Sequence, residues 1–589
     1  MVASDPSLAR RAVFLLLVLA ILAGLVALAV AALAPGGWSA AEVAILLCYL
    51  GAVPWSALST ANPLIGFVIR MGSRDPLGTV LPALRAARPL GGVPRLSTAI
   101  AVCVRSEDMT AVVLPPLARL LDGLEAAGAG HRFALWILSD TQDPALAAAE
   151  EEAVRSFAEA RAGRPIPVRY RRRAENAGFK AGNLMDFLDR HAAGHELFLP
   201  LDADSEMSAA AVLRLVTCME ADPALAVVQP LIAGRPARAA FPRLFQFNMR
   251  QGMRSWATGQ AWWQGDEGPY WGHNAILRIE PFRRHCRLET LPDGSPILSH
   301  DQVEATRLHA AGWKVRVLPD DTGSLEANPP AMPEFLARDR RWAAGNMQYL
   351  ALLRQPGLTA MARWQLVQAI LLFAAAPLWC LILVLAVANA ASGGGEGTPP
   401  GALAAFLLAS WGAYYAAELL GHAEVLLKPV LAARYGGRAR FALGAAGAML
   451  FAVLFQPVRL MHQTRFLLRL AFGGTRAGWA PQNRAEHGVA WGDAARLFWP
   501  ETVLGLVLTA ALAATSWSAL LFGLPFLAGL VLAVPLCVLT ADPGFSAWLA
   551  RHGVAATPEE LAAAALRDPE SPASATARGG TEAAEEAPA

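Results

Sequence analysis

The sequence contains few cysteines and almost no net charge. Its six cysteines in 589 residues show no paired spacing, so the sequence indicates neither a disulfide framework nor a zinc site. The formal net charge of +2 is small and evenly spread, which does not favour a nucleic-acid-binding protein. A chain with 55% hydrophobic and only 17% charged residues is too apolar for an ordinary soluble enzyme. The composition therefore indicates membrane segments.

Long apolar runs lie near both ends of the chain. A membrane-spanning helix needs roughly 20 apolar residues, and two runs of about that length come before residue 60. A cleaved signal peptide is the alternative for the first run, but the run is long for one and Pro35 would follow the cleavage site. The expected spans are 13–34, 41–59, 365–391, 402–420, 441–455 and two more within 503–541 that fold back near Ser516.

The positions of Lys and Arg predict the orientation of these spans. Arg10 and Arg11 precede the first run, basic residues follow the second, and the connection between the two is uncharged. The long polar middle of the chain is therefore expected in the cytoplasm.

The cationic stretch 459–500 does not fit this pattern, because a single span at 441–455 would place it outside. Either 441–472 forms a hairpin of two short spans, or its apolar part lies along the membrane interface. We prefer the hairpin, which gives eight spans.

The polar middle alternates short apolar runs with amphipathic ones. The apolar runs predict strands, and 114–127 and 144–162 predict helices between them. This alternation is typical of an α/β fold with a mostly parallel sheet, in which ligands bind beyond the carboxyl ends of the strands. The expected strands are 98–104, 133–138, 168–171, 197–201 and 226–229.

Acidic residues follow three of the first four expected strands. Glu107 comes after the first, Asp140 after the second, and Asp202 and Asp204 after the fourth. Two carboxylates one residue apart at a strand end can hold a hard divalent cation and the sugar diphosphate that it bridges. Solvated turn carboxylates are the alternative, since Asp-x-Asp is common by chance.

Two further motifs have chemistry that suits a nucleotide-sugar. Transfer of a glycosyl group needs a base for the acceptor hydroxyl, and Asp301 precedes an expected helix, where it could equally be an N-cap. The glycine in 179–184 allows close backbone approach, and Lys180 can meet a phosphate. An ordinary turn into a helix is the alternative for that segment. The basic run 169–173 is interpreted as a solvated strand edge.

Aromatic and basic residues complete the set of candidates. The face of Trp342 can stack on a sugar ring, and the neighbouring Arg338 and Arg341 can pair with phosphate. Anchoring of this amphipathic helix at the membrane surface is the alternative. Trp271 and His273 lie in a stretch rich in aromatic and amide groups, as in carbohydrate sites, although core packing could also explain it.

In order and context, these motifs resemble the processive family 2 glycosyltransferases, which include cellulose and hyaluronan synthases. That family has Asp, Asp-x-Asp, Asp and then Gln-x-x-Arg-Trp, with Lys-Ala-Gly-Asn between the first two. Arg338 stands where the wider family has Gln. The matches here are Asp140, Asp202 with Asp204, Asp301, Arg341 with Trp342, and 180–183.

Three stretches narrow the resemblance to the glucans biosynthesis glucosyltransferase H group, inner-membrane enzymes of Gram-negative bacteria that make osmoregulated periplasmic glucans. They are 270–276, 297–301 and 338–342. The resemblance implies an α-helical transmembrane bundle with a cytoplasmic α/β domain of the GT-A fold. It also implies UDP-glucose as donor, Mg²⁺ (or Mn²⁺) as the ion, and an inverting reaction that gives β linkages. The growing glucan chain, membrane lipid and a periplasmic glucan-processing protein would be the other partners.

The resemblance also implies roles for single residues. It assigns the uridine part of the donor to Glu107 and Asp140, further donor contacts to Lys180, Asn183 and Asp202, the metal to Asp202 and Asp204, the general base to Asp301, and the acceptor to Arg338, Arg341, Trp342, Trp271 and His273.

The expected organisation has six parts. They are two transmembrane helices at 1–60, a cytoplasmic linker at 61–94, the GT-A domain at 95–330, interfacial amphipathic helices at 331–362, a transmembrane region at 363–541 with a cytoplasmic loop at 474–500, and a cytoplasmic tail at 542–589 that is disordered at its end. Within the loop, 478–484 lies where the related synthases place a gating loop over the donor, so the resemblance implies that role for it. A cellulose-like or hyaluronan-like synthase of another polysaccharide is one alternative. A membrane transporter with a cytoplasmic ligand-binding domain is another.

Overall fold

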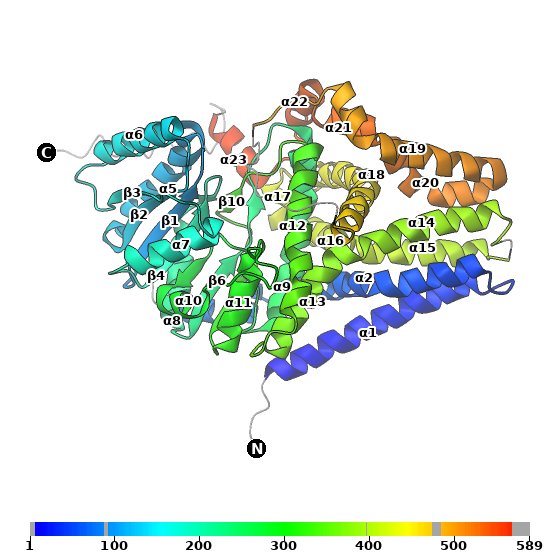
Figure 1. Ribbon diagram of the computed structural model, residues 1–589, viewed down its shortest axis with the longest axis horizontal. Coiled ribbons are helices and arrows are strands. Elements are labelled where there is room, and N and C mark those ends of the chain that lie inside the picture. Colours follow the sequence, from blue (N-terminus) through cyan, green and yellow to red (C-terminus); the bar gives the residue numbers. More distant parts are fainter. Residues whose placement is uncertain (1–5, 88–91, 396, 474–484, 568–589) are drawn as a thin grey trace, which may run out of the picture.

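The computed structural model describes residues 6–87, 92–395, 397–473 and 485–567. An α/β domain forms one end of the molecule, and long helices extend from the other (Figure 1). Two of these helices, α1 (Pro6–Leu33) and α2 (Ala40–Gly72), precede the α/β domain, and the others follow it. The expected combination of membrane-type helices with an α/β domain is confirmed.

The centre of the α/β domain, within the described residues, is a seven-stranded sheet in the order β3-β2-β1-β4-β8-β6-β9. Neighbouring strands are parallel except at β8, which is antiparallel to β4 and β6. All five predicted strands are present, with bounds within one residue of those expected, whereas the short β8 and β9 were not predicted. The strands are β1 (Thr98–Val104), β2 (Phe133–Ser139), β3 (Val168–Arg172), β4 (Leu197–Asp202), β6 (Leu225–Pro230), β8 (Ile276–Arg278) and β9 (Lys314–Leu318).

Helices cover both faces of this sheet. Alternate residues of β1 point to opposite faces, so that Ile100 packs in the same apolar cluster as helices α5 and α8, and Ala101 packs in the cluster of α7. Burial of both faces explains why β1, β2 and β4 read as nearly continuous apolar runs. The helices of this domain are α5 (Leu114–Ala126), α6 (Pro144–Ala160), α7 (Phe179–Arg190), α8 (Ala209–Ala221), α10 (Ile279–His285) and α11 (His300–Ala310).

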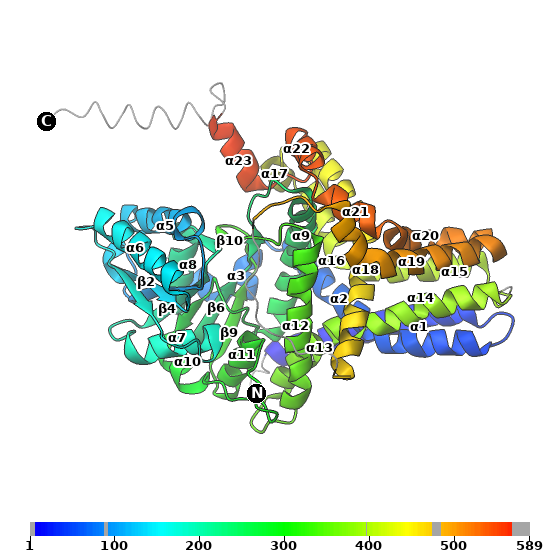
Figure 2. The ribbon, with the colours of Figure 1, turned by 45° about the horizontal axis from the view of Figure 1, so that its top comes forward.

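A small second sheet and two long helices lie between the main sheet and the membrane-type helices. The small sheet has the order β5-β10-β7, with β5 (Glu206–Met207), β7 (Ala233–Gly234) and β10 (Ser324–Glu326). The long helices are α9 (Ala240–Gln264) and α12 (Met332–Leu352), which stand between the two parts of the molecule in both views (Figures 1 and 2).

Helix α2 is longer than expected, because the predicted linker at 61–94 begins with its last turns. It continues to Gly72 through Pro54 and Pro63, and the short helices α3 (Pro76–Val80) and α4 (Pro82–Ala87) follow it. Proline is tolerated in membrane helices when neighbouring groups satisfy the freed backbone. The extra turns of α2 pack closely on α9, since a Cβ at Gly259 would lie 1.9 Å from the carbonyl oxygen of Asn62.

Five described helices are long and apolar enough to cross a membrane. If each of two bent helix pairs counts as one span, the number of candidate spans rises to seven. The bent pairs are α15 with α16, at 74°, and α20 with α21, at 57°. The predicted turn near Ser516 is confirmed, since its hydroxyl caps α20 by accepting from Ala519 N. The helices after α12 are α13 (Ala360–Ala374), α14 (Ala376–Ala391), α15 (Pro400–Tyr414), α16 (Ala416–Leu427), α17 (Pro429–Arg434), α18 (Arg438–Ala471), α19 (Trp491–Thr515), α20 (Trp517–Val531) and α21 (Ala533–Thr540).

The predicted hairpin at 441–472, and with it the eighth span, is wrong. Helix α18 runs unbroken through this region and includes Pro457, because good helix formers such as Leu, Arg and Gln continue after the proline. Figure 2 shows α18 crossing the ends of the long helices rather than running beside them, and α18 packs on α9 and α12 as well as on α14 and α20. This placement agrees with the alternative that its apolar part lies along the membrane interface.

The C-terminal part is more structured than predicted. Helix α19 begins at Trp491, so that the end of the expected loop at 474–500 is helical, and the expected gating segment at 478–484 lies outside the described residues. In the expected tail, α22 (Pro543–Arg551) packs on α9 and α21, and α23 (Pro558–Arg567) follows it. Helix α23 is tied to α9 by an ion pair of 2.6 Å between Arg250 and Glu559. Residues 568–589, where disorder was expected, also lie outside the described residues.

Candidate active site

The expected acidic residues meet at one edge of the main sheet. Strand β1 lies between β2 and β4 and is parallel to both, with Val104 opposite Ser139 and Cys103 opposite Asp202. Asp140, which directly follows β2, and Asp202, the last residue of β4, therefore leave the sheet side by side. Glu107, three residues after β1, is half-buried at the same edge.

Asp140 is buried and held by Arg173. The Arg173 guanidinium donates from Nε to Oδ1 at 2.7 Å and from NH2 to Oδ2 at 2.8 Å, a bidentate pair. It also donates to the carbonyl of Phe179 at 3.1 Å, which fixes the loop before α7. The interpretation of 169–173 as a solvated strand edge therefore missed the role of Arg173 in holding Asp140. The sequence signal that could have revealed this role is the position of Arg173 directly after the carboxyl end of a strand.

Asn183 lies in the interior of the domain. Its Oδ1 accepts from Arg171 at 2.7 Å, and its Nδ2 donates to the carbonyl of Leu138 at 3.1 Å. The side chain is fully buried and joins α7 to β2 and β3. This position favours a supporting role, and direct donor contact by Asn183 stays a prediction.

Lys180 joins the two halves of the site. Its Nζ donates to Asp202 Oδ1 and, at 2.9 Å, to the carbonyl of Gly272. Burial opposes its charge, but Asp202, Cys103 and Asp301 together raise the pKa of Lys180. The loop before it is close-packed, since a Cβ at Gly182 would lie 2.1 Å from the carbonyl oxygen of Ala177. A fixed ammonium group therefore stands beside the Asp-x-Asp motif.

His273 is held among acidic and hydroxyl groups. Its Nδ1 is 3.3 Å from Ser205 Oγ, and its Nε2 is 3.4 Å from a carboxylate oxygen of Glu326 on β10. Burial opposes protonation, yet Asp202 and Glu326 raise the pKa of His273 to about 9, so that the imidazole is a cation at neutral pH. The backbone N–H of the neighbouring Trp271 donates to Gln229 Oε1 at 3.0 Å.

Asp301 faces this cluster from α11. A Cβ at Gly272 would lie 3.5 Å from Asp301 Cβ and 3.6 Å from its Oδ2, so the two residues are in contact. Burial raises the pKa of the Asp301 carboxyl, and Glu304 adds to this effect while His300 opposes it. Ser299 holds the N-cap position and α11 begins at His300. The alternative that Asp301 is merely an N-cap is therefore wrong.

Helix α12 brings its basic and aromatic residues to the same place. Its Gly345 packs against the residue at the start of α11, since a Cβ there would lie 2.1 Å from Ser299 Oγ, and Tyr349 donates to the carbonyl of Ser299 at 2.8 Å. One turn earlier, Trp342 is 47% exposed, with the Arg338 guanidinium 4.6 Å from its ring centre. The Arg338 guanidinium thus covers one face of the indole and holds the ring in place.

The two basic residues of this motif differ in surroundings. Arg338 is buried, and burial lowers its pKa although Glu326 and Asp204 favour its charge. Arg341 is half-buried on the neighbouring part of α12. Glu326 thus lies between His273 and Arg338. Sequence reasoning missed Glu326 because no motif marks it and the small sheet that carries it was not predicted.

The described residues contain no group of three or more His, Cys, Asp or Glu side chains that could hold a metal ion by themselves. Asp202 and Asp204 offer two carboxylates at the end of β4, where the Asp202 side chain is 33% exposed. A hard divalent ion takes oxygen ligands and can complete its shell with phosphate and water. The pair therefore suits an ion that arrives with a diphosphate.

Comparisons with known proteins find glycosyltransferases similar to this chain. Residues 197–420 match the family model described as glycosyl transferase family group 2. The glucans biosynthesis glucosyltransferase H of Caulobacter vibrioides is 34% identical over 561 residues, which cover 90% of this chain and 81% of that protein. The protein of the same name from Xylella fastidiosa is 30% identical, covering 90% of this chain and 84% of its own.

One solved structure also matches part of the chain. It is a mannosyltransferase of Pyrobaculum calidifontis in complex with GDP-Man and Mn²⁺, with 18% identity, 63% of this chain and 99% of that chain covered, and a TM-score of 0.38. The identity and coverage of the curated relatives are what decide the family. The chain belongs to the glucans biosynthesis glucosyltransferase H family, within group 2 of the glycosyltransferases.

Proposed function

We propose that this glucosyltransferase takes glucose from UDP-glucose at the cytoplasmic face of the inner membrane and builds the β-linked backbone of osmoregulated periplasmic glucans. The observation that carries the proposal is the meeting of Asp202, Lys180 and Asp301 around Gly272. Lys180 suits a diphosphate, Asp202 suits the metal ion bound to that diphosphate, and Asp301 suits the acceptor hydroxyl. Such a set of opposite charges is what transfer from a nucleotide-sugar requires.

The donor side of the site uses the carboxyl ends of the parallel strands. Asp140, fixed by Arg173, and Glu107 would contact the uridine part, and Lys180 would pair with the diphosphate. Asp202 and Asp204 would hold Mg²⁺ (or Mn²⁺). When bound, this ion would neutralise charge on the leaving diphosphate.

The acceptor side is formed by α11 and α12. The ionised Asp301 would take the proton of the acceptor hydroxyl, which then attacks the anomeric carbon directly and inverts it. Trp342 would stack on the acceptor sugar, since its exposed indole is held in place by Arg338. Arg341, His273 and Trp271 would complete the acceptor contacts.

The proposed orientation places the α/β domain in the cytoplasm. With α18 in the interface, six of the seven candidate spans remain, and an even number returns the chain to the side of the domain. The cationic stretch 459–500 then stays inside, as the distribution of Lys and Arg requires. The growing glucan would leave through the spans to a periplasmic glucan-processing protein.

The test is UDP release by the purified full-length protein in a lipid bilayer. We expect release from UDP-glucose but far less from GDP-mannose, loss of release on removal of divalent ions with EDTA, and recovery with Mg²⁺ or Mn²⁺. Folded protein that binds UDP-glucose without releasing UDP under any of these conditions would refute the enzyme and favour the transporter alternative.

A further inference from the structure

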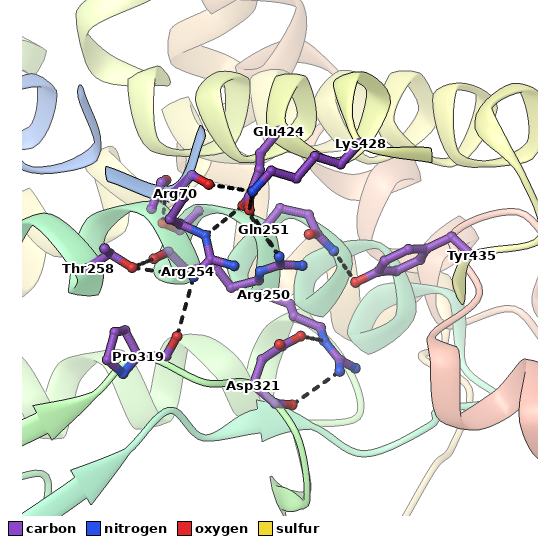
Figure 3. Close-up of polar contacts among 12 residues, drawn as sticks. Arg70, Arg250, Gln251, Arg254, Thr258, Pro319, Asp321, Glu424, Lys428 and Tyr435 are labelled. Carbon is purple, nitrogen blue, oxygen red and sulfur yellow. Dashed lines mark hydrogen bonds and ion pairs between the residues drawn. The ribbon is translucent and has the colours of Figure 1, made fainter. Parts of the chain in front are cut away.

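Basic residues gather where two membrane-type helices end against the α/β domain (Figure 3). Arg70 lies in the last turns of α2, Lys428 directly follows α16, and Arg254 comes from α9. All three contact Glu424, with distances of 2.8 Å from Arg70 Nε, 3.4 Å from Arg254 NH2 and 3.3 Å from Lys428 Nζ. One buried carboxylate thus faces three cations.

The neighbouring ion pairs do not remove this excess of positive charge. Arg250 contacts Asp321 at 2.6 Å and Glu559 at 2.6 Å, and Arg434 acts electrostatically on Asp321. The cluster as a whole therefore holds five cations and three anions. Buried and partly buried charges are costly unless they are paired, so a further anion would stabilise this cluster.

Arg254 gives independent evidence for a missing partner. Its side chain is 2% exposed, and its Nε and NH1 have no hydrogen-bond partner in the part of the chain that the structure describes. Buried donors in proteins are nearly always hydrogen-bonded. An anion or ordered water beside Glu424 would satisfy them.

A cleft of about 390 Å³ opens beside this cluster, and both basic and apolar side chains line it. Its lining has a charged part, formed by Arg70, Glu424 and Lys428, and an apolar part that includes Leu427, Val430 and Leu431. Leu427 is 58% exposed and Val430 is 80% exposed. A basic end with an exposed apolar wall fits an anionic headgroup with an attached acyl chain, and basic pockets at the ends of membrane helices bind such lipids.

We propose that this cleft binds an anionic phospholipid, with its phosphate at Lys428 and Arg70 and an acyl chain along Leu427 and Val430. Inorganic phosphate shares the charge of the headgroup but cannot use the apolar wall. Arg70 also donates to the carbonyl of Pro319 at 3.5 Å, in the segment that leads to β10 and Glu326. The bound lipid would thus hold the membrane helices and the site-bearing segment together. The proposal goes beyond the glucosyltransferase reaction and does not depend on it.

The experiment measures binding by the full-length protein in neutral detergent. We expect phosphatidylglycerol to raise the Tm and to remain bound in native mass spectrometry. Phosphatidylcholine at the same concentration and inorganic phosphate at tenfold excess should do neither. An equal effect of phosphatidylcholine, or of phosphate, would overturn the assignment to an anionic lipid. Because no catalysis is measured, inactive protein would leave this result unchanged.

Variants place the lipid in this cleft. Lys428→Gln should weaken phosphatidylglycerol binding about fivefold, since one basic side chain near an anionic surface contributes ~1 kcal/mol. Val430→Glu should also weaken it, and this variant loses no packing because Val430 is mostly exposed. Arg438→Gln is the matched control, because it removes an exposed charge from the neighbouring α18 and should bind as the unaltered protein does. Unchanged binding in both cleft variants would overturn the location.

Discussion

Asp301 lies in the first turn of α11, where burial raises the pKa of its carboxyl. The folded protein therefore binds this proton more tightly than the unfolded chain does, and the ionised carboxylate costs stability at neutral pH. Asp301→Asn is expected to lower UDP release about 100-fold or more without lowering the Tm. Glu289→Gln, at an exposed position in the connection between α10 and α11, is the control that should change neither. Substantial UDP release by Asp301→Asn would remove Asp301 as the base.

The same carboxyl predicts the acid side of the pH profile. A base works only when ionised, so kcat is lost as the pH falls through the pKa of Asp301. Because burial raises that pKa, the loss should begin above the ordinary value of 3.8. A kcat that stays constant down to pH 4, measured on protein shown to stay folded, would contradict this assignment.

Substitution of Trp342 distinguishes acceptor binding from donor binding. Its indole is 47% exposed and carries Arg338 on one face, which leaves the other face for a sugar. Trp342→Ala should reduce glucan formation about fivefold, since an aromatic stacking contact contributes ~1 kcal/mol, while UDP affinity stays unchanged. Trp342→Phe should keep part of the activity. Calorimetric UDP titration and glucan yield give the two readouts, and a loss of UDP affinity instead would place Trp342 on the donor side.

The residue positions of the site could be predicted, but not all of the roles. Asp140, Asp202 and Asp301 follow from strand ends and a motif, because the topology of a parallel sheet brings strand ends together. The inward side chain of Asn183 and the contribution of Glu326 depend on contacts between distant segments. Local sequence does not contain that information.

At the scale of elements, the contact of α2 with α9 depends on glycine. Each helix brings a glycine to the crossing, and a Cβ at Gly259 would lie 1.9 Å from the backbone oxygen of Asn62. Gly259→Ala should therefore lower the Tm by several degrees or prevent folding, because the helices must separate. Gly412→Ala in α15 meets nothing within 4 Å and should leave the Tm unchanged. Equal Tm values for the two variants would contradict this close packing.

The placement of α18 predicts the side of the membrane on which the segment after it lies. Single cysteines at Gly488, at Ser392 and at Glu289 of the α/β domain, in a chain without its own cysteines, can be labelled with an impermeant maleimide. Gly488→Cys and Glu289→Cys should both react with the maleimide only after the inner membrane is opened. Ser392→Cys should react with it in intact spheroplasts. Labelling of Gly488→Cys from outside would mean that α18 crosses the membrane.

The strands were predicted more accurately than the membrane helices for a physical reason. Strands of a sheet that is buried on both faces must be apolar along their length, so β1, β2 and β4 are marked in the sequence. Hydropathy measures only how apolar α18 is. Its direction depends on packing against α9 and α12, which lie far away in the chain.

At the scale of the whole molecule, α9, α12 and α18 form the layer that joins the α/β domain to the membrane-type helices (Figure 2). Ion pairs extend this layer: Asp339 of α12 accepts from Arg459 of α18 at 2.9 Å, and Arg250 of α9 contacts Glu559 of α23. The site-bearing helix α12 is therefore fixed relative to the spans. This arrangement suits the proposed coupling of glucan synthesis to export.

The most direct test is linkage analysis of the product that the purified protein makes from radiolabelled UDP-glucose in proteoliposomes. The account predicts a β-linked chain of glucose that forms only with a divalent ion and is absent with Asp301→Asn. Folded, UDP-binding protein that incorporates no glucose, or an α-linked product, would contradict it.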